Sequence, residues 1–191
     1  AVPATTPPRN VVRPTLDQEV PSDSIGGMLQ WTKAFAGAHF VTAGADVRWI
    51  DGNGEERGPL SLDDLGDGYR ILYFVQHWCP GCHAHGFPTL VRLVAELADR
   101  NVGFAAIQTV FEGFEANTFE RIRDNQQRYG LKIPFGHAGP AAGKSLPALM
   151  EDYRTGGTPW FVIIAPDGGV VRNGFQLDPD ALVRLLRPLT A

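Results

Sequence analysis

The chain has 191 residues, 43% of them hydrophobic, a composition typical of a globular protein with one sizeable core. Its formal net charge of −4 gives no electrostatic reason to expect a nucleic acid or an anionic membrane as a partner. No apolar run approaches the roughly 18 residues that a transmembrane helix needs, and no signal peptide is recognisable in the sequence.

The first part of the chain differs in composition from the rest. Residues 1–24 contain five prolines and few large apolar side chains. Because proline fixes φ and lacks a backbone donor, this stretch is expected to be extended rather than helical or part of a sheet. Further on, Met28, Trp31 and Phe35 recur at helical spacing and predict a short helix. Residues 1–38 are therefore expected to form a proline-rich arm that carries this helix.

The next elements predict a hairpin followed by a strand, a helix and a second strand. Residues 46–65 have the pattern of a β-hairpin with its Asp-Gly-Asn-Gly turn at residues 51–54. Residues 70–78 are almost continuously apolar, as expected of a central strand that is covered on both faces. Leucines and a valine at helical spacing predict a helix over residues 87–100, and residues 102–111 read as another buried strand.

The second half of the chain predicts helices over residues 117–130, 145–154 and 178–189, and a hairpin over residues 160–175. Gly130 is placed to end the first of these helices. Asp178 is a plausible cap for the last one, with Pro179 at its first position. The main elements run in the order β-β-α-β-α-β-β-α, which predicts an α/β domain over residues 39–191 with a mixed sheet between helices.

The only two cysteines, Cys79 and Cys82, form a Cys-x-x-Cys motif directly after the predicted central strand. A disulfide across so short a loop removes little entropy from the unfolded chain, so this pair is not a structural disulfide framework. The motif is therefore expected to serve chemistry rather than stability. Haem attachment, metal binding and thiol redox chemistry all use cysteines at this spacing.

Haem attachment is suggested by the sequence from Cys79 to His83, which has the Cys-x-x-Cys-His form of c-type attachment motifs. That motif is short, and it arises by chance whenever a Cys-x-x-Cys precedes a histidine. The flanking strand and the α/β pattern do not suit a small helical cytochrome. Only Met28 and Met150 are available as sulfur ligands to the iron. Haem is therefore the least favoured of the three interpretations.

A metal site is suggested by five candidate ligands within nine residues: His77, Cys79, Cys82, His83 and His85. Thiolates and imidazoles bind zinc and copper. A structural zinc site usually takes its second ligand pair from a separate segment, whereas these ligands all come from one strand end and one helix turn. We expect no resident metal, and we keep a copper-binding chaperone or redox sensor as an alternative function.

The redox interpretation has a direct physical basis, because the motif lies between a buried strand and a helix. The helix N-terminus presents unpaired N–H groups and a partial positive charge, which together stabilise a thiolate on Cys79. Cys82 is expected one turn inside the helix, shielded from solvent and able to resolve a mixed disulfide at Cys79. His83 and His85 are candidates to place protons or charge near this pair.

Three segments resemble the thioredoxin superfamily, most closely its TlpA/ResA-type thiol–disulfide oxidoreductases with a redoxin (AhpC/TSA-like) domain. Residues 60–82 resemble that branch's turn, buried strand and Trp-Cys-Pro-x-Cys-like active site. Residues 156–171 resemble its Gly-Thr-Pro strand and Asp-Gly hairpin, and residues 178–186 resemble its closing helix. The resemblance runs from about Phe40 to the C-terminus. It implies a thioredoxin-like, three-layer α/β/α fold with a mixed central sheet and an extra N-terminal hairpin.

The same resemblance implies roles for residues around the cysteines. It implies that Pro159 is a cis proline that faces the disulfide, and we place it with the two cysteines in the catalytic group. The backbone of Thr158 is implied to bind an incoming substrate strand. Trp78, Pro80 and Gly81 are expected at the surface that contacts the substrate.

The sequence departs from the family pattern at four places, one of which is the Pro80-Gly81 dipeptide between the cysteines, where thioredoxin has Gly-Pro. Thioredoxins carry a buried carboxylate six residues before the first cysteine, where this chain has Tyr73, so no proton acceptor for Cys82 is assigned. His85 stands where TlpA/ResA-type proteins often have a glutamate. Pro88 falls nine residues after Cys79, where the family's helix proline usually falls eight after it. These departures leave the direction of the reaction open.

The sequence thus predicts an enzyme, a thiol–disulfide oxidoreductase that needs no bound cofactor besides the disulfide of Cys79 and Cys82. The resemblance implies protein thiols and disulfides as substrates, another redox protein as electron donor or acceptor, and a periplasmic or otherwise extracytoplasmic location, with the cytoplasm left open. A peroxiredoxin-like peroxidase is a further alternative. Peroxiredoxins use Pro-x-x-x-Thr-x-x-Cys, and Leu72 and Gln76 at the corresponding positions lack the activating hydroxyl.

Overall fold

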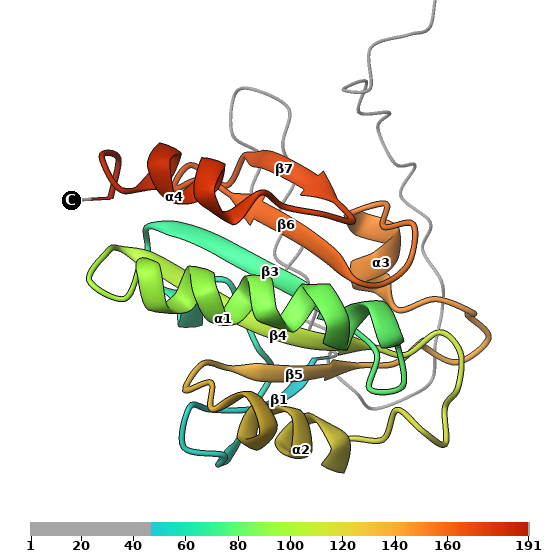
Figure 1. The fold of residues 1–191 in the computed structure, drawn as a ribbon. Coiled ribbons are helices and arrows are strands. Elements are labelled where there is room, and N and C mark those ends of the chain that lie inside the picture. Colours follow the sequence, from blue (N-terminus) through green and yellow to red (C-terminus); the bar gives the residue numbers. More distant parts are fainter. Residues whose placement is uncertain (1–46, 191) are drawn as a thin grey trace, which may run out of the picture.

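A mixed sheet forms the centre of the molecule, and helices cover both of its faces (Figure 1). The computed structural model describes residues 47–190, so the predicted arm over residues 1–38 and its short helix lie outside the described residues. The strands are β1 (Arg48–Ile50), β2 (Glu56–Arg57), β3 (Tyr69–Val75), β4 (Val102–Thr109), β5 (Phe135–Ala138), β6 (Trp160–Ile164) and β7 (Val170–Gly174). The helices are η1 (Asp63–Leu65), η2 (Cys82–Gly86), α1 (Phe87–Glu96), α2 (Glu120–Tyr129), α3 (Ala148–Asp152) and α4 (Pro179–Leu186).

The sheet has the strand order β2-β1-β5-β4-β3-β6-β7. Its central strands β3, β4 and β5 are parallel, and α1 and α2 provide the crossovers that parallel neighbours require. β6 pairs with β3 in the antiparallel direction, so β6 begins at the edge where β3 ends. The predicted mixed sheet is confirmed, and its topology brings the start of β6 next to the chain that leaves β3.

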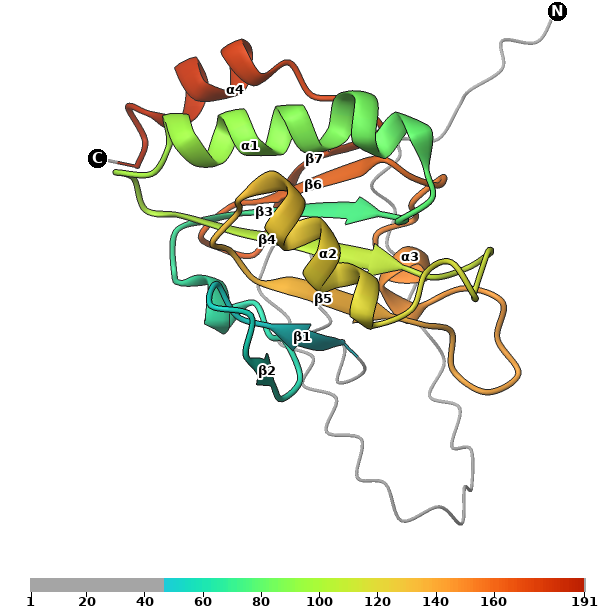
Figure 2. The same cartoon turned by 60° about the horizontal axis from the view of Figure 1, so that its bottom comes forward.

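The two faces of the sheet carry separate apolar cores. On one face Leu90 of α1, Ile122 of α2 and Leu182 of α4 belong to the same buried cluster. On the other face Leu149 of α3 packs in a second cluster with Phe74 of β3. Figure 2 shows α1 and α4 together above one face of the sheet, and the β1–β2 hairpin at the edge of the sheet far from β7. The predicted three-layer architecture is therefore confirmed, with β3 buried on both faces.

The predicted N-terminal hairpin is confirmed and has an additional role in the sheet. Its turn is held by Asp51, whose Oδ1 accepts the N–H groups of Asn53 at 2.8 Å and Glu55 at 3.0 Å. β1 also pairs with β5, a strand that the sequence did not predict. β5 is only Phe-Gly-His-Ala, too short and too irregular to show a strand pattern, and it is extended because β4 and β1 pair with it on both sides.

Helix ends follow the predicted signals with small shifts. α2 begins at Glu120 rather than at residue 117, and Gly130 ends it with a left-handed φ of 62°. The Asp178 side chain caps α4 by accepting the N–H of Ala181 at 3.1 Å. Within residues 47–190, none of the helices combines the length and the apolar character that crossing a bilayer would demand.

Candidate active site at the end of strand β3

Cys79 lies where β3 gives way to a helix, as the sequence predicted. β3 ends at Val75, a turn follows, and helical structure begins at Pro80. The Cys79 N–H donates to the carbonyl of Gln76 at 3.1 Å, which closes this turn. We refer to residues 76–79 as the redox turn. Cys79 therefore stands directly before a helical segment, where the first N–H groups have no partners within the helix.

The two cysteines differ in burial, and both are free thiols in this structure. The Cys82 side chain is fully buried, whereas Cys79 retains 8% exposure. The Cys82 N–H donates to the Sγ of Cys79 at 3.3 Å, so the backbone at the start of the helix supports charge on the outer sulfur. Burial raises the pKa of the Cys82 thiol, which keeps it protonated in the resting dithiol.

Pro159 lies against the redox turn although it is far from the cysteines in sequence. The Thr158–Pro159 peptide bond is cis. The Cys79 Sγ lies 3.6 Å from the carbonyl oxygen of Thr158, to which the thiol donates. A Cβ added to Gly81 would lie 3.4 Å from the Cδ of Pro159. The structure therefore brings Cys79, Gly81, Thr158 and Pro159 together, and their catalytic and binding roles stay predictions.

Several exposed aromatic side chains lie in segments that adjoin the site along the chain. Trp78, directly before Cys79, is 46% exposed, and Phe114 is exposed in the loop after β4. Phe175, directly after β7, is exposed and packs edge-on against Trp160 at a centroid distance of 4.5 Å. Pro80, between the cysteines, is also exposed. The expected role of Trp78 and Pro80 in substrate contact stays a prediction.

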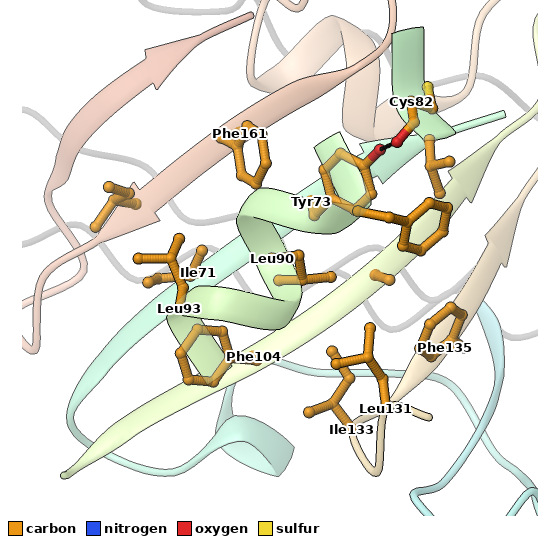
Figure 3. Packing of buried hydrophobic residues seen from close by; sticks show 14 of the residues in the cluster. Ile71, Tyr73, Cys82, Leu90, Leu93, Phe104, Leu131, Ile133, Phe135 and Phe161 are labelled. Carbon is orange, nitrogen blue, oxygen red and sulfur yellow. Dashed lines mark hydrogen bonds between the residues drawn. The ribbon is translucent and has the colours of Figure 1, made fainter. Parts of the chain in front are cut away.

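Tyr73 stands at the position where thioredoxins carry a buried carboxylate, but it cannot act as a proton acceptor as a carboxylate does. Its hydroxyl donates to the backbone carbonyl of Cys82 at 3.0 Å, as the dashed line in Figure 3 shows. Burial raises the Tyr73 pKa far above its usual range, with the nearby cysteines as smaller causes. Tyr73 is therefore a neutral donor that holds the start of the helix, and it does not accept the Cys82 proton.

The extra residue between Cys79 and Pro88 is absorbed in a π-helical turn. η2 spans Cys82–Gly86, and the N–H of Phe87 donates to the carbonyl of Cys82, five residues back. Such a turn holds one residue more than an α-turn, which accounts for the displaced proline. The turn also places Gly86 over Tyr73, where an added Cβ would lie 2.1 Å from the tyrosine Oη. Only glycine therefore fits at position 86 while Tyr73 keeps its present place.

The histidines near the cysteines are arranged very differently from one another. The Nε2 of His83 lies 2.5 Å from the carbonyl oxygen of His77 and must donate to it. The Nδ1 of His83 bonds the Tyr129 hydroxyl at 2.7 Å, and the ring stacks on Phe87. His85 is exposed on η2. His83 thus links the redox turn to α2, and the proposed charge-placing roles of both residues stay predictions.

The five candidate metal ligands do not converge. In the part of the chain that the structure describes, no group of three or more His, Cys, Asp or Glu side chains is arranged to hold a metal ion. The His77 ring faces Asn125 at 3.2 Å, and His83 is occupied by Tyr129. A copper site built from both cysteines and these histidines therefore has no support from the geometry.

We expect His77 and His137 to make the stability of the protein sensitive to mild acid. Burial lowers the pKa of both rings, and the Nε2–H of His137 donates to the Asn117 carbonyl at 2.9 Å. A lowered folded pKa means that the unfolded chain binds more protons, so stability is present above about pH 6.5 and is lost as the pH falls below it. We expect His137→Asn to flatten the change in the free energy of unfolding between pH 7 and pH 5, measured in urea. An equal slope in the wild type and in His137→Asn would contradict this.

Sequence reasoning missed the polar residues that support the redox turn. Asn117 was read as the start of a helix, whereas it lies in the loop before α2, is 1% exposed and bonds the backbone of His77. Gln76 and Tyr129 also contact the site from inside the fold. Their partners are tens of residues away along the chain, so no local pattern marks them. The displaced proline was the single sequence signal of unusual geometry here.

Comparisons with known proteins support a thioredoxin-like fold and include thiol–disulfide enzymes. No protein-family model matches the chain. A probable nucleoredoxin 1 of Arabidopsis thaliana is 27% identical over 118 residues, which are 62% of this chain and 19% of that protein, so the chain spans about a fifth of its length. A thiol-disulfide isomerase structure from Corynebacterium glutamicum has a TM-score of 0.64 and 28% identity, covering 76% of this chain and 93% of its own.

Two further structures extend the fold comparison. A thioredoxin-like superfamily protein has a TM-score of 0.60 and 28% identity over 69% of this chain and 84% of its own. The thioredoxin domain of a Bacteroides vulgatus thiol-disulfide oxidoreductase, at 18% identity, has a TM-score of 0.55 over 77% of this chain and 95% of its own. The expected three-layer fold is therefore confirmed, while assignment to one branch stays a prediction.

Proposed function

Because the chain has a thioredoxin-like fold with paired thiols at the end of β3, we propose that it is a thiol–disulfide oxidoreductase acting on protein partners. One observation carries this proposal: the outer sulfur of Cys79 lies 3.3 Å from the Cys82 N–H and 3.6 Å from the Thr158 carbonyl, with Cys82 fully buried behind it. The residual exposure of Cys79 and the full burial of Cys82 support the roles of attacking and resolving sulfur that two-step exchange requires.

In the reducing direction the Cys79 thiolate attacks one sulfur of a partner disulfide. The partner's S–S bond breaks, a mixed disulfide forms, and the released partner sulfur takes up a proton. Cys82 then loses its proton and attacks the Sγ of Cys79, which forms the Cys79–Cys82 disulfide and frees the second partner thiol. Two electrons pass to the partner. In the oxidising direction the same steps run in reverse, and neither direction needs a further cofactor.

The surroundings of Cys79 suggest how a partner is held. The Thr158 carbonyl lies 3.6 Å from the attacking sulfur and supports a role of this backbone in partner binding. Trp78, Pro80 and Gly81 lie within two residues of Cys79 along the chain, and we assign them to partner contact together with Thr158. The similarity to a probable nucleoredoxin and to a thiol-disulfide isomerase supports protein thiols and disulfides as substrates.

The finer assignments belong to the same proposal. We place the chain near TlpA/ResA-type proteins because of the motifs at residues 60–82 and 156–171, and an extracytoplasmic location follows from that placement. The regenerating partner is then a second redox protein that exchanges electrons with the Cys79–Cys82 pair.

The function is tested by a redox titration of the Cys79–Cys82 pair in glutathione buffers, with insulin reduction assayed alongside. We expect one two-electron transition and catalysed insulin reduction. A protein that fails to reduce insulin but loses its thiols in a rapid burst with dilute peroxide would instead be a peroxidase. Submicromolar copper(I) binding that depends on both cysteines, without insulin reduction, would favour the copper-binding alternative.

A further inference from the structure

The buried side chain of Asn117 joins the redox turn to the loop between β4 and α2. Asn117 in this loop is 1% exposed, and its Oδ1 accepts the backbone N–H of His77 at 2.7 Å. Its Nδ2 donates to the carbonyls of Glu112 and Gly113, both at 3.0 Å. The side-chain amide of Asn117 thus bonds the redox turn through its oxygen and the loop through its nitrogen.

The residues on either side of His77 contact the same loop. The Nε2 of Gln76 donates to the Glu112 carbonyl at 3.3 Å. The indole of Trp78 lies so close to Gly113 that an added Cβ there would come within 2.7 Å of its Nε1. All three residues that precede Cys79 are therefore held by the loop over residues 112–117. The loop is in turn anchored to β5, because His137 donates to the Asn117 carbonyl.

We propose that Asn117 is a positioning residue that sets the place of Cys79 by holding the backbone of the redox turn. This inference rests on the proposed function, since it concerns the same pair of sulfurs. In the dithiol, the Sγ of Cys79 receives the N–H of Cys82 at the start of the helix, and that contact stabilises charge on the sulfur. A turn released from Asn117 no longer holds the sulfur there, so the dithiol loses stability relative to the disulfide.

The test compares Asn117→Ala with the wild-type protein in glutathione redox buffers at pH 7, with the fraction of disulfide measured by thiol labelling and mass spectrometry. We expect the equilibrium constant to shift at least fivefold toward the disulfide, and iodoacetamide to modify Cys79 more slowly. Asn125→Ala is the matched control, because Asn125 is also 1% exposed and bonds the ring of His77 rather than the backbone of the redox turn. The equilibrium constant of Asn125→Ala between dithiol and disulfide should stay within twofold of the wild-type value. Equal shifts in both variants, or no shift in Asn117→Ala, would overturn the proposal.

Gly113→Ala provides a second variant that keeps every hydrogen-bonding group of Asn117. Gly113 has a left-handed φ of 58°, and its added Cβ would lie 2.7 Å from the Nε1 of Trp78 and 3.3 Å from the Nδ2 of Asn117. The change therefore pushes the loop away from the redox turn, and the shift should have the same direction as in Asn117→Ala. Gly143→Ala is its control, since Gly143 also has a left-handed φ, of 77°, and no atom lies within 4 Å of a Cβ added there. If Asn117→Ala does not fold, an unshifted Gly113→Ala rejects the inference.

Glutathione equilibrium needs no protein substrate, so the two proposals fail separately. If the variants show the expected shifts but the wild-type protein never reduces insulin, the proposed function is rejected and the role of Asn117 stands. A wild-type protein that reduces insulin while the Asn117→Ala equilibrium is unchanged would reject only the role of Asn117.

Discussion

Replacing Cys79 with serine is expected to lower insulin reduction by about three orders of magnitude or more. The outer sulfur is the accessible one, and a serine hydroxyl neither attacks disulfides nor forms a mixed disulfide. Cys82 does not take over, because it is fully buried beneath the redox turn and its pKa is raised by that burial. Insulin reduction with dithiothreitol as electron donor measures the loss.

Cys82→Ser provides the matched comparison for this experiment. This variant keeps the attacking sulfur and lacks the resolving one, so mixed disulfides with insulin should accumulate and appear on non-reducing gels and in mass spectra. Circular dichroism should show both variants folded, because serine is close in size to cysteine. Full activity of Cys79→Ser, or trapping by that variant rather than by Cys82→Ser, would reverse the assigned roles of the two sulfurs.

Gly86→Ala is expected to destabilise the fold by about 2–3 kcal/mol, although alanine usually strengthens a helix. The added Cβ would lie 2.1 Å from the Oη and 2.6 Å from the Cζ of Tyr73. Tyr73 has no room to retreat, because its fully buried ring packs against Phe87 and Phe161, with ring centroids 5.1 Å and 4.8 Å away. Figure 3 shows Phe161 beside Tyr73. Urea denaturation at pH 7 measures the change in the free energy of unfolding.

Two further variants separate this clash from a general effect of alanine. Gly58→Ala adds a Cβ with no atom within 4 Å, and it should change stability by less than about 0.5 kcal/mol. Combining Gly86→Ala with Tyr73→Leu should cost less than the sum of the two single changes, because the shorter side chain removes the contact. Additive costs, or a Gly86→Ala protein as stable as wild type, would show that the two residues do not constrain each other.

Much of the fold follows from local patterns. The apolar run in β3 predicts burial on both faces, since apolar and aromatic side chains follow Arg70 without alternating with polar ones. Asp51, Gly130 and Asp178 end or begin their elements through contacts within a few residues, so their signals are visible in the sequence itself. β5 shows the limit of this reasoning, because its four residues are extended only by pairing with β1 and β4.

The sequence by itself determined the paired sulfurs, their place after a buried strand, and the presence of one residue too many before Pro88. Only the tertiary structure decided that this residue is absorbed in a π-helical turn, that Tyr73 is a neutral donor, and that Asn117 holds the redox turn. The physical reason is the range of the interactions. Periodicity and turn chemistry act between near neighbours, whereas these buried hydrogen bonds join segments that only the folded sheet brings together.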